Sequence, residues 1–169
     1  MLGVPGGKVI LVPWTKQWEI EFLSEKNVIE TEIGELVIAV HHIGSTAVKN
    51  LSGKPIIDIA IEIEDKDSGA AIKGLESLGY VHKPDAALPE RHYLTKGSPR
   101  THQIHMFNKG NPFIRKHLAF RDYLRTNENE RVRYEQLKVD LANTHSNNRI
   151  AYADGKTDFV NEILLKIGL

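Results

Sequence analysis

The chain has 169 residues, of which 41% are hydrophobic and 26% are charged, the composition of a globular domain long enough to bury a core. Its 22 Lys and Arg residues equal its 22 Asp and Glu residues, so no overall positive field favours nonspecific binding to nucleic acid. The absence of Cys excludes disulfides and thiolate metal sites. The chain shows neither a signal-peptide pattern nor an apolar run of membrane-spanning length, and we expect a cytoplasmic protein with no membrane partner.

The N-terminal part of the chain begins with a short apolar run and then changes to helical periodicity. Residues 8–12 (KVILV) predict a strand that ends at Pro13, and Thr15 is the expected N-cap of a helix that reaches about residue 33. This helix should pack against the core through one apolar face, which carries Trp18, Phe22, Ile29 and Ile33.

Two longer strands are predicted next, at residues 35–43 and 56–63. A loop of residues 46–54 separates them. Either Asp67 or Ser68 can then cap a second helix, which ends before Gly79.

The remainder of the chain reads as short strands followed by helices. Strands are predicted at residues 80–82, 91–95 and 102–107, the last two as a hairpin. The pair Asn111-Pro112 is a strong helix start, because Asn caps the first turn and Pro fits its first position. Helices are predicted at residues 113–126, 128–145 and 157–167.

This order of elements predicts an α/β (α+β) fold in which helices flank a mixed β-sheet and the C-terminal third is helical. We expect a single domain over residues 1–169, with a sheet-bearing part at about 1–110 and a helical part at about 111–169.

A bend followed by an acidic strand carries the most specific chemical pattern. Gly44 lets the backbone turn tightly, and Ser45 adds a hydroxyl and an N–H group that can hold phosphate oxygens. Asp58 lies on a strand whose opposite face is formed by Ile57, Ile59, Ile61 and Ile63. The Asp58 carboxylate therefore points away from the core and can bind a divalent ion. This combination is typical of a nucleotidyl-transfer site.

The segments HHIGSTAV, KPIIDI, HQIHMF and FRDYLR resemble the GrpB family, the "glutamate-rich protein B" group of small bacterial proteins. The resemblance covers nearly the whole chain from Trp18 to the C-terminal helix, and it includes the later spacings Y-x-x-LK and K-x-x-F. It implies a nucleotidyltransferase-like fold, because the family is placed in the nucleotidyltransferase superfamily.

The superfamily pattern has two carboxylates two residues apart on one strand, so that both can bind a pair of Mg²⁺ ions about 3.5–4 Å apart. Here the second position is Ala60. The next carboxylate on that face is Glu62, about 13 Å from Asp58 along the strand, which makes it a weak metal ligand.

His105 occupies the place of the third carboxylate in the pattern that the resemblance implies. Imidazole suits Zn, Cu, Fe or Ni better than Mg²⁺, and His42 or His102 is a further candidate for the same site. Two interpretations remain open. Either one metal ion binds to Asp58 while substrate phosphates supply other ligands, or the catalytic pair is lost and the site only binds.

Cations on the predicted C-terminal helices complete the candidate site. Arg121 lies one turn from Arg125, and Lys138 one turn from Tyr134. We expect the charge of a triphosphate to be neutralised by Arg121, Lys138 and Lys156. Further candidates on the hairpin are Arg91 and Arg100.

The same residues also fit structural roles. The Gly-Ser pair is a common turn, Asp58 can pair with Lys54, and His105 can be a hydrogen-bonded core residue. Arg121 and Arg125 can pair with neighbouring carboxylates on an exposed helix.

The sequence predicts a nucleotidyltransferase with Asp58 and His105 as catalytic residues and phosphate bound by Gly44, Ser45 and the three cations. It would take a nucleoside triphosphate and a divalent metal (Mg²⁺, Mn²⁺ or another transition metal) and use a small acceptor, with nucleic acid not expected as a partner. The alternative is a catalytically degenerate module that binds a nucleotide or a phosphorylated metabolite.

Overall fold

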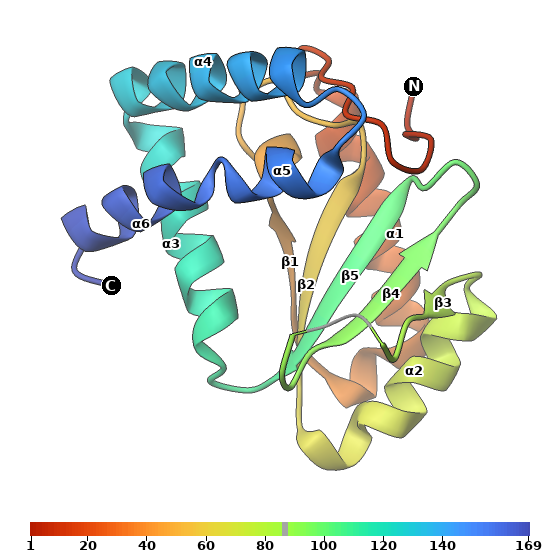
Figure 1. Cartoon of the computed structure of the whole chain (residues 1–169). Helices are drawn as coiled ribbons and strands as arrows, with labels where there is room; N and C mark the ends of the chain where they lie inside the picture. Colours follow the sequence, from red (N-terminus) through yellow and green to blue (C-terminus); the bar gives the residue numbers. More distant parts are fainter. Residues whose placement is uncertain (86–87) are drawn as a thin grey trace.

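The computed structural model describes residues 1–85 and 88–169. Its centre is a five-stranded sheet in the order β1-β2-β5-β4-β3 (Figure 1). β2 and β5 pair in parallel and the other neighbours are antiparallel, so the sheet is mixed, as predicted. The strands are β1 (Val37–Ile43), β2 (Ile57–Ile63), β3 (Val81–His82), β4 (His92–Lys96) and β5 (His102–Asn108).

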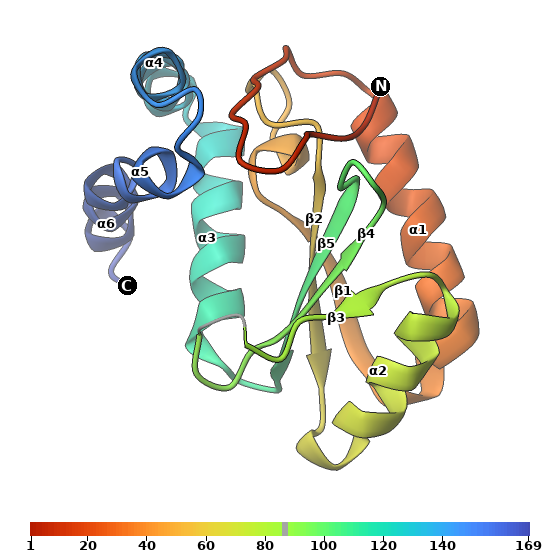
Figure 2. The same cartoon turned by 45° about the vertical axis from the view of Figure 1, so that its right-hand side comes forward.

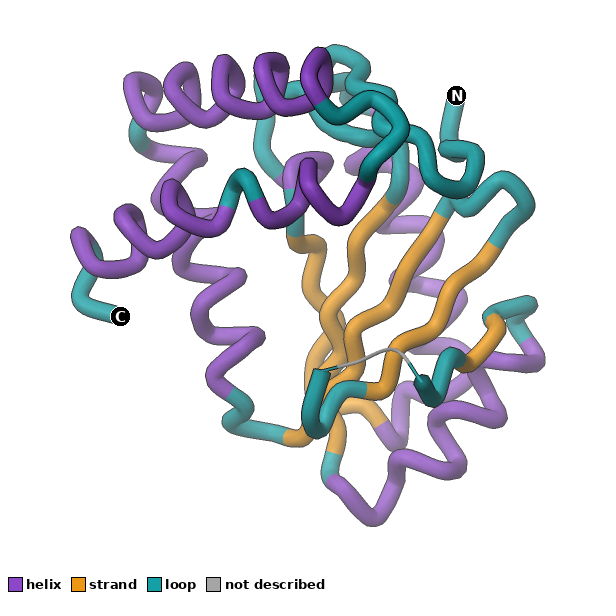
Figure 3. Tube along the Cα trace, in the orientation of Figure 1, coloured by secondary structure: helices purple, strands orange, loops and turns teal. Residues whose placement is uncertain are grey.

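Helices cover both faces of the sheet (Figure 2). α1 (Gln17–Ile33) and α2 (Ser68–Ser77) lie on one face, and α3 (Pro112–Thr126) lies on the other. Beyond α3 the chain is mainly helical, with short loops between the helices (Figure 3), and it passes through α4 (Glu128–Thr144), α5 (Arg149–Asp154) and α6 (Thr157–Lys166). None of the helices that the structure describes is long and apolar enough to cross a bilayer.

The main core lies between the sheet and α1. The four isoleucines of β2 are fully buried there, and they pack with the helix residues expected from the sequence, which are Trp18, Phe22, Ile29 and Ile33. The opposite face of β2 begins with Asp58 and continues with Ala60, which packs beneath α3 against Ile43, Phe107 and Ile114. The alternation of side chains along β2 thus directs Asp58 toward α3 and away from the main core, as predicted.

A second apolar cluster fastens the helical part to the segment that follows the bend. Val48 and Leu51 pack against side chains of α3, α4 and α6. The same segment accepts hydrogen bonds from α3, because the Arg125 guanidinium donates through Nε and Nη2 to the Ala47 carbonyl at 2.9 and 2.7 Å. The helices therefore hold the bend in place from outside.

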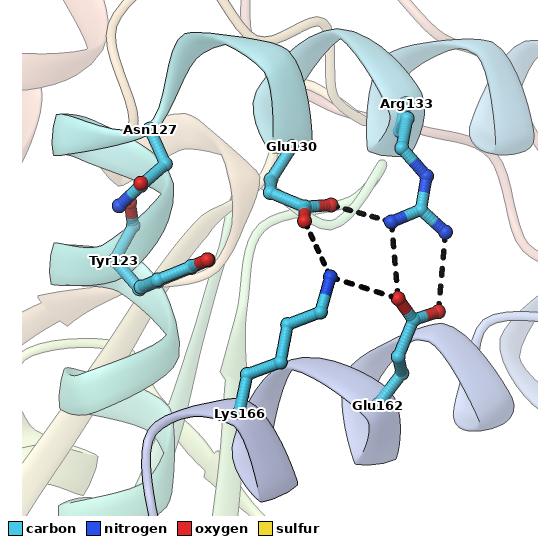
Figure 4. Close-up of polar contacts among 6 residues, drawn as sticks. All are labelled: Tyr123, Asn127, Glu130, Arg133, Glu162 and Lys166. Carbon is cyan, nitrogen blue, oxygen red and sulfur yellow. Dashed lines mark hydrogen bonds and ion pairs between the residues drawn. The ribbon is translucent and has the colours of Figure 1, made fainter.

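An exposed ionic network joins α4 to α6 (Figure 4). The Arg133 guanidinium lies 2.6 Å from a Glu130 oxygen and 3.1 Å from a Glu162 oxygen. Lys166 lies 2.6 Å from Glu130 and 3.0 Å from Glu162. Four alternating charges in one network orient the two helices better than one isolated surface pair would.

The structure differs from the sequence predictions at one strand and one helix. The strand at 8–12 does not form: Val12 makes an isolated bridge to Gly53, and the Val9 N–H donates to the Ser146 carbonyl at 2.8 Å. The six-residue helix α5 was not predicted. The first helix begins at Gln17, where the Thr15 hydroxyl accepts from the Gln17 N–H at 3.3 Å, in keeping with its predicted capping role.

Replacing Ile59 with Ala should destabilise the protein strongly. Ile59 is fully buried at the centre of β2, and a buried Ile→Ala change costs about 2–5 kcal/mol. The matched control is Ile38→Ala on β1, because Ile38 is 44% exposed. Urea unfolding of both variants measures the difference, and equal losses of unfolding free energy would contradict the assignment of the core.

Candidate functional site

The bend after β1 brings the backbone directly against Asp58. Gly44 has φ 72° and ψ −173°, a conformation that favours glycine. Ile43 pairs with Asp58 across the β1–β2 ladder. A Cβ atom at Gly44 would lie 2.7 Å from Asp58 Oδ2 and 3.2 Å from Asp58 Cβ, so a side chain at this position would displace the carboxylate.

Two side chains from β5 position the other carboxylate oxygen. Gln103 pairs with Asp58 in the ladder and donates its amide N–H to Oδ1. His105 Nε2 lies 3.6 Å from the same oxygen. Burial opposes ionisation, but His105, Gln103 and Lys54 together hold the pKa of Asp58 below its ordinary value. Asp58 is therefore a carboxylate at neutral pH, and its Oδ2 faces the bend.

The tautomer of His105 follows from its second neighbour. Arg91 Nη1 lies 3.3 Å from His105 Nδ1. Because a guanidinium can only donate, Nδ1 accepts this hydrogen bond and the proton of a neutral ring lies on Nε2, on the side of Asp58. His105 is thus placed to orient the carboxylate.

These groups open into a pocket of about 540 Å³ between the sheet, α3 and α6. Much of its wall is apolar and aromatic, formed by Phe113, Phe120, Tyr134, Tyr152 and Leu164. The structure brings six of the predicted site residues together on this one pocket: Gly44, Ser45, Asp58, His105, Arg121 and Lys156.

Arg121 and Lys156 reach the pocket from different helical segments. The Arg121 guanidinium donates to the His42 carbonyl at 2.9 Å and to Asp122 at 2.8 Å. The Lys156 amine lies 4.5 Å from the centre of the Tyr152 ring. Burial, together with the nearby charge of Lys54, lowers the pKa of Lys156 to about 8. Both side chains are thus held in defined positions and can attract a phosphate.

Lys138 lies behind the bend and does not line the pocket. It is 1% exposed, and its amine donates to Ser45 Oγ at 3.1 Å and to the Ser52 carbonyl. Burial lowers its pKa to about 7. In this position Lys138 braces Ser45, and its contact with a bound phosphate would pass through the Ser45 hydroxyl.

The sequence interpretation was wrong about two candidate ligands. His42 stacks on Phe22 with ring centres 4.5 Å apart and contacts Thr46 Oγ1 at 2.9 Å. His102 Nδ1 contacts Thr101 Oγ1 at 2.9 Å. His42 pairs with Ile59 and His102 with Ile57, so strand alternation turns both rings to the face that α1 covers, away from Asp58.

Glu62, the weak candidate, lies outside the pocket. The ring Nε2 of His41 lies 3.9 Å from a Glu62 oxygen, and burial lowers the pKa of this imidazole. The spacing along β2 had indicated this distance from Asp58.

Two residues of the site were missed by the sequence interpretation. Gln103 could have been found from its spacing, because it lies two residues before His105 and so shares its face. Lys54 lines the pocket and had been considered only as a structural partner of Asp58. Burial lowers the pKa of the Lys54 amine, while the Asp58 carboxylate acts in the opposite direction.

The donor set does not fit a pair of metal ions. Among the described residues there is no group of three or more His, Asp or Glu side chains that could hold a metal. Ala60, in the place of the second carboxylate, is fully buried beneath Phe107 and Ile114. A single divalent ion would have Asp58 as its carboxylate ligand here and would need further oxygen ligands from outside the chain.

Comparisons of sequence place this chain among bacterial relatives. The profile of the family described as GrpB protein matches residues 8–166. Glutamate-rich protein GrpB of Alkalihalophilus pseudofirmus is 35% identical over 171 residues, covering 97% of this chain and 98% of the relative. YqkA of Bacillus subtilis is 39% identical over 140 residues, covering 82% of this chain and 41% of YqkA. The chain therefore spans less than half of that longer relative.

Comparisons of structure extend to nucleotidyl-transferring enzymes. The crystal structure of conserved protein GrpB from Enterococcus faecalis has a TM-score of 0.85 at 34% identity, covering 93% of this chain and 96% of that one. A chain of the GLD-2/RNP-8 complex has a TM-score of 0.60 at 16% identity, covering 94% and 62%. Cid1 in complex with its short product ApU has a TM-score of 0.55 at 13% identity, covering 78% and 42%. The fold is therefore nucleotidyltransferase-like.

Replacing Gly44 with Ala should cost more stability than replacing Gly110 with Ala. Both glycines have positive φ, 72° and 79°, and the shared backbone cost is about 1 kcal/mol. A Cβ at Gly110 meets no described atom within 4 Å, whereas one at Gly44 meets Asp58 Oδ2 at 2.7 Å. Chemical denaturation measures the excess loss at Gly44, and equal losses would mean that the carboxylate does not lie against the bend.

Lys138 should make the protein more stable as pH rises. Its pKa is about 7 in the folded chain against an ordinary value of 10.5, so between these values the unfolded chain binds the extra proton. The free energy of unfolding should rise more steeply from about pH 7 to about pH 9 in the native chain than in Lys138→Met. Urea unfolding measures it, with Lys73→Met on exposed α2 surface as control. Parallel curves for the native chain and Lys138→Met would contradict the burial of a charged amine.

Proposed function

The chain belongs to the GrpB protein family, and we propose that it binds a nucleoside triphosphate with one divalent metal ion and transfers the nucleotidyl group to a small acceptor. The observation that carries this proposal is the position of Asp58 Oδ2 against the Gly44 bend. A metal held by this oxygen would lie next to phosphates held by the bend. Arg121 and Lys156 line the same pocket. They would neutralise the part of the triphosphate charge that one divalent ion does not balance.

The shape of the pocket supports a nucleoside as the remaining part of the ligand. At about 540 Å³ it lies within the usual range of small-molecule sites, about 300–1,000 Å³. Its aromatic wall, including Phe113 and Phe120, offers stacking surface to a base. A Cid1 mutant, whose fold this chain shares at 11% identity, was solved bound to MgATP.

The residues of this chain would act mainly by positioning and by stabilising charge. An oxygen of the acceptor attacks the α-phosphorus as the bond to the bridging oxygen breaks, and pyrophosphate leaves. A divalent ion bound at Asp58 would polarise the phosphoryl oxygens. Lys156 and Arg121 stabilise charge on the departing pyrophosphate, while His105 and Gln103 hold Asp58 in place. Because Ala60 provides no second carboxylate, the acceptor proton passes to solvent, and we expect slow turnover.

One observation favours a second candidate function. Apolar packing buries Ala60, in the place of the second carboxylate of the superfamily pattern. A protein that keeps the phosphate pocket without this group could sense a nucleotide or a phosphorylated metabolite and perform no transfer. The two functions differ in whether pyrophosphate is released.

Replacing Asp58 with Asn should abolish metal-dependent nucleotide binding and leave the fold intact. Asp58 faces the pocket and not the main core, so the substitution removes a metal ligand without creating a cavity. Calorimetric titrations with ATP, GTP, CTP and UTP, each with and without Mn²⁺, measure the loss. The control is Glu62→Gln, on the same face of β2 but outside the pocket, which should bind as the native chain does.

Release of pyrophosphate by the native chain would support the transferase. Metal-independent binding that Asp58→Asn does not change, without pyrophosphate release, would support the binding module instead. A native chain that binds none of these nucleotides would contradict both.

A further inference from the structure

A second cleft adjoins the nucleotide pocket on the other side of His105 and Gln103. Its volume is about 780 Å³. The two spaces share wall residues from the loop before β2, from β5 and from α5, among them Lys54, Gln103, His105 and Ala153. A molecule in the second cleft would therefore lie next to the polar end of the first pocket.

The second cleft is strongly basic. Five cations line it, against two carboxylates, Asp85 and Asp154; the cations are Lys54, Lys83, Arg91, Arg100 and Arg149. Within residues 1–85 and 88–169, no ion pair joins any of these five cations to a carboxylate. The five cations therefore exceed the acidic groups that line the cleft, and the excess positive charge is not paired with described carboxylates.

Two arginines of the cleft are held in place by tyrosine and still have unused donors. The Arg91 guanidinium lies 4.7 Å from the centre of the Tyr93 ring, and Arg100 Nη1 donates to the Tyr93 hydroxyl at 3.0 Å. Both arginines make their hydrogen bonds to described residues through Nη1, and their Nε atoms are buried without a partner, so the donors left for a ligand are those of Nη2. Guanidinium groups that are held in place and form no ion pair with a described carboxylate are suited to binding a phosphate.

The charges in the cleft also act on one another. Burial lowers the pKa of the Lys54 amine; the Asp58 carboxylate acts in the opposite direction, and the charges of Arg100 and Arg149 lower the pKa further. Cations that oppose each other's ionisation would be relieved by an anion between them. This favours an anionic occupant over a neutral one.

A chain of hydrogen bonds connects the basic cleft to the candidate catalytic carboxylate. Arg100 donates to the Tyr93 hydroxyl, this hydroxyl donates to Gln103 Oε1 at 2.7 Å, and the Gln103 amide donates to Asp58 Oδ1. An anion bound at Arg100 would thus be linked to Asp58 through three side chains, Arg100, Tyr93 and Gln103.

We infer that the second cleft holds the acceptor and that this acceptor is a small hydroxyl compound carrying a phosphate monoester. The inference rests on the proposed function. The acceptor phosphate binds between Arg100 and Arg149, and a free hydroxyl reaches toward Asp58. The acceptor oxygen bonds to the α-phosphorus of the nucleotide, pyrophosphate leaves with the electron pair of the broken P–O bond, and the hydroxyl proton goes to water. The nucleotide triphosphate stays in the first pocket, because Gly44 and Ser45 line only that one of the two spaces.

Calorimetry with ribose 5-phosphate tests this inference, with ribose and inorganic phosphate as separate probes. The variants are Arg100→Gln and Arg149→Gln, and the control Lys73→Gln removes the same charge from exposed α2 surface. Arg149 is exposed, so its substitution is compatible with the fold. We expect ribose 5-phosphate to bind and ribose not to bind. Each arginine variant should weaken the phosphate ester at least about tenfold, the loss of one charge-assisted hydrogen bond, and Lys73→Gln should not.

Nucleotide binding in the presence of Mn²⁺ separates this inference from the proposed function. We expect Arg100→Gln and Arg149→Gln to bind nucleotide within about twofold of the native chain, because they do not line the first pocket. Two results would overturn the acceptor site and leave the nucleotide site in place. One is an unchanged ribose 5-phosphate affinity in both arginine variants, and the other is a native chain that binds inorganic phosphate but not ribose 5-phosphate. If the arginine variants lose as much nucleotide affinity as ribose 5-phosphate affinity, the cleft binds the triphosphate, and the acceptor site is overturned in that case too. A native chain that binds no nucleotide would overturn the proposed function and, with it, the acceptor role.

Discussion

The contact between Gly44 and the Asp58 carboxylate is the constraint on which the rest of the site depends. No side chain fits at Gly44 without displacing Oδ2, so the bend and the carboxylate form one surface. The β1–β2 register sets this contact, because it pairs Ile43 with Asp58. The parallel strand β5 then brings Gln103 against the other oxygen. The helices complete the arrangement from outside, through Arg125 at the Ala47 carbonyl and Lys138 at the Ser45 hydroxyl.

Much of the fold could be predicted from the sequence because its elements have regular periodicity. The alternation along β2 indicated which face Asp58 takes, and the stripe on α1 indicated the main core. The apolar run KVILV was misleading: an apolar run forms a strand only where a neighbouring strand edge is available, and here Val9 meets the Ser146 carbonyl of a distant loop. α5 was not predicted because its six residues are too few to show a helical periodicity of apolar side chains.

The candidate site was predictable where strand geometry decides, and much less so where tertiary packing decides. Strand alternation gave the face of Asp58, and the family resemblance placed His105 beside it. The orientation of His42 depended on its pairing with Ile59, which the sequence did not reveal. The sequence placed Lys138 on a helix. The burial of its side chain depends on how α4 lies over the bend, which the sequence did not reveal. Lys54 was overlooked because a lysine before a proline in a loop carries no periodic signal.

The balance of charge distinguishes this site from a two-metal centre. One carboxylate faces the bend, and apolar packing fills the position of a second at Ala60. Lysine and arginine side chains line part of the remaining space, among them Lys54, Arg121 and Lys156. Fixed cations can stabilise phosphate charge without a second metal ion, although they cannot accept a proton from an acceptor as a carboxylate can. Under the proposed function, this arrangement would favour strong binding with slow transfer.

The most direct test is a crystal structure of the protein with Mn²⁺ and a non-hydrolysable nucleoside triphosphate, with the metal located by its anomalous scattering. The account predicts one manganese peak, bound by Asp58 Oδ2 and by phosphate oxygens that contact the Gly44-Ser45 bend. A second peak near Ala60, phosphates bound away from the bend, or a metal remote from Asp58 would contradict it.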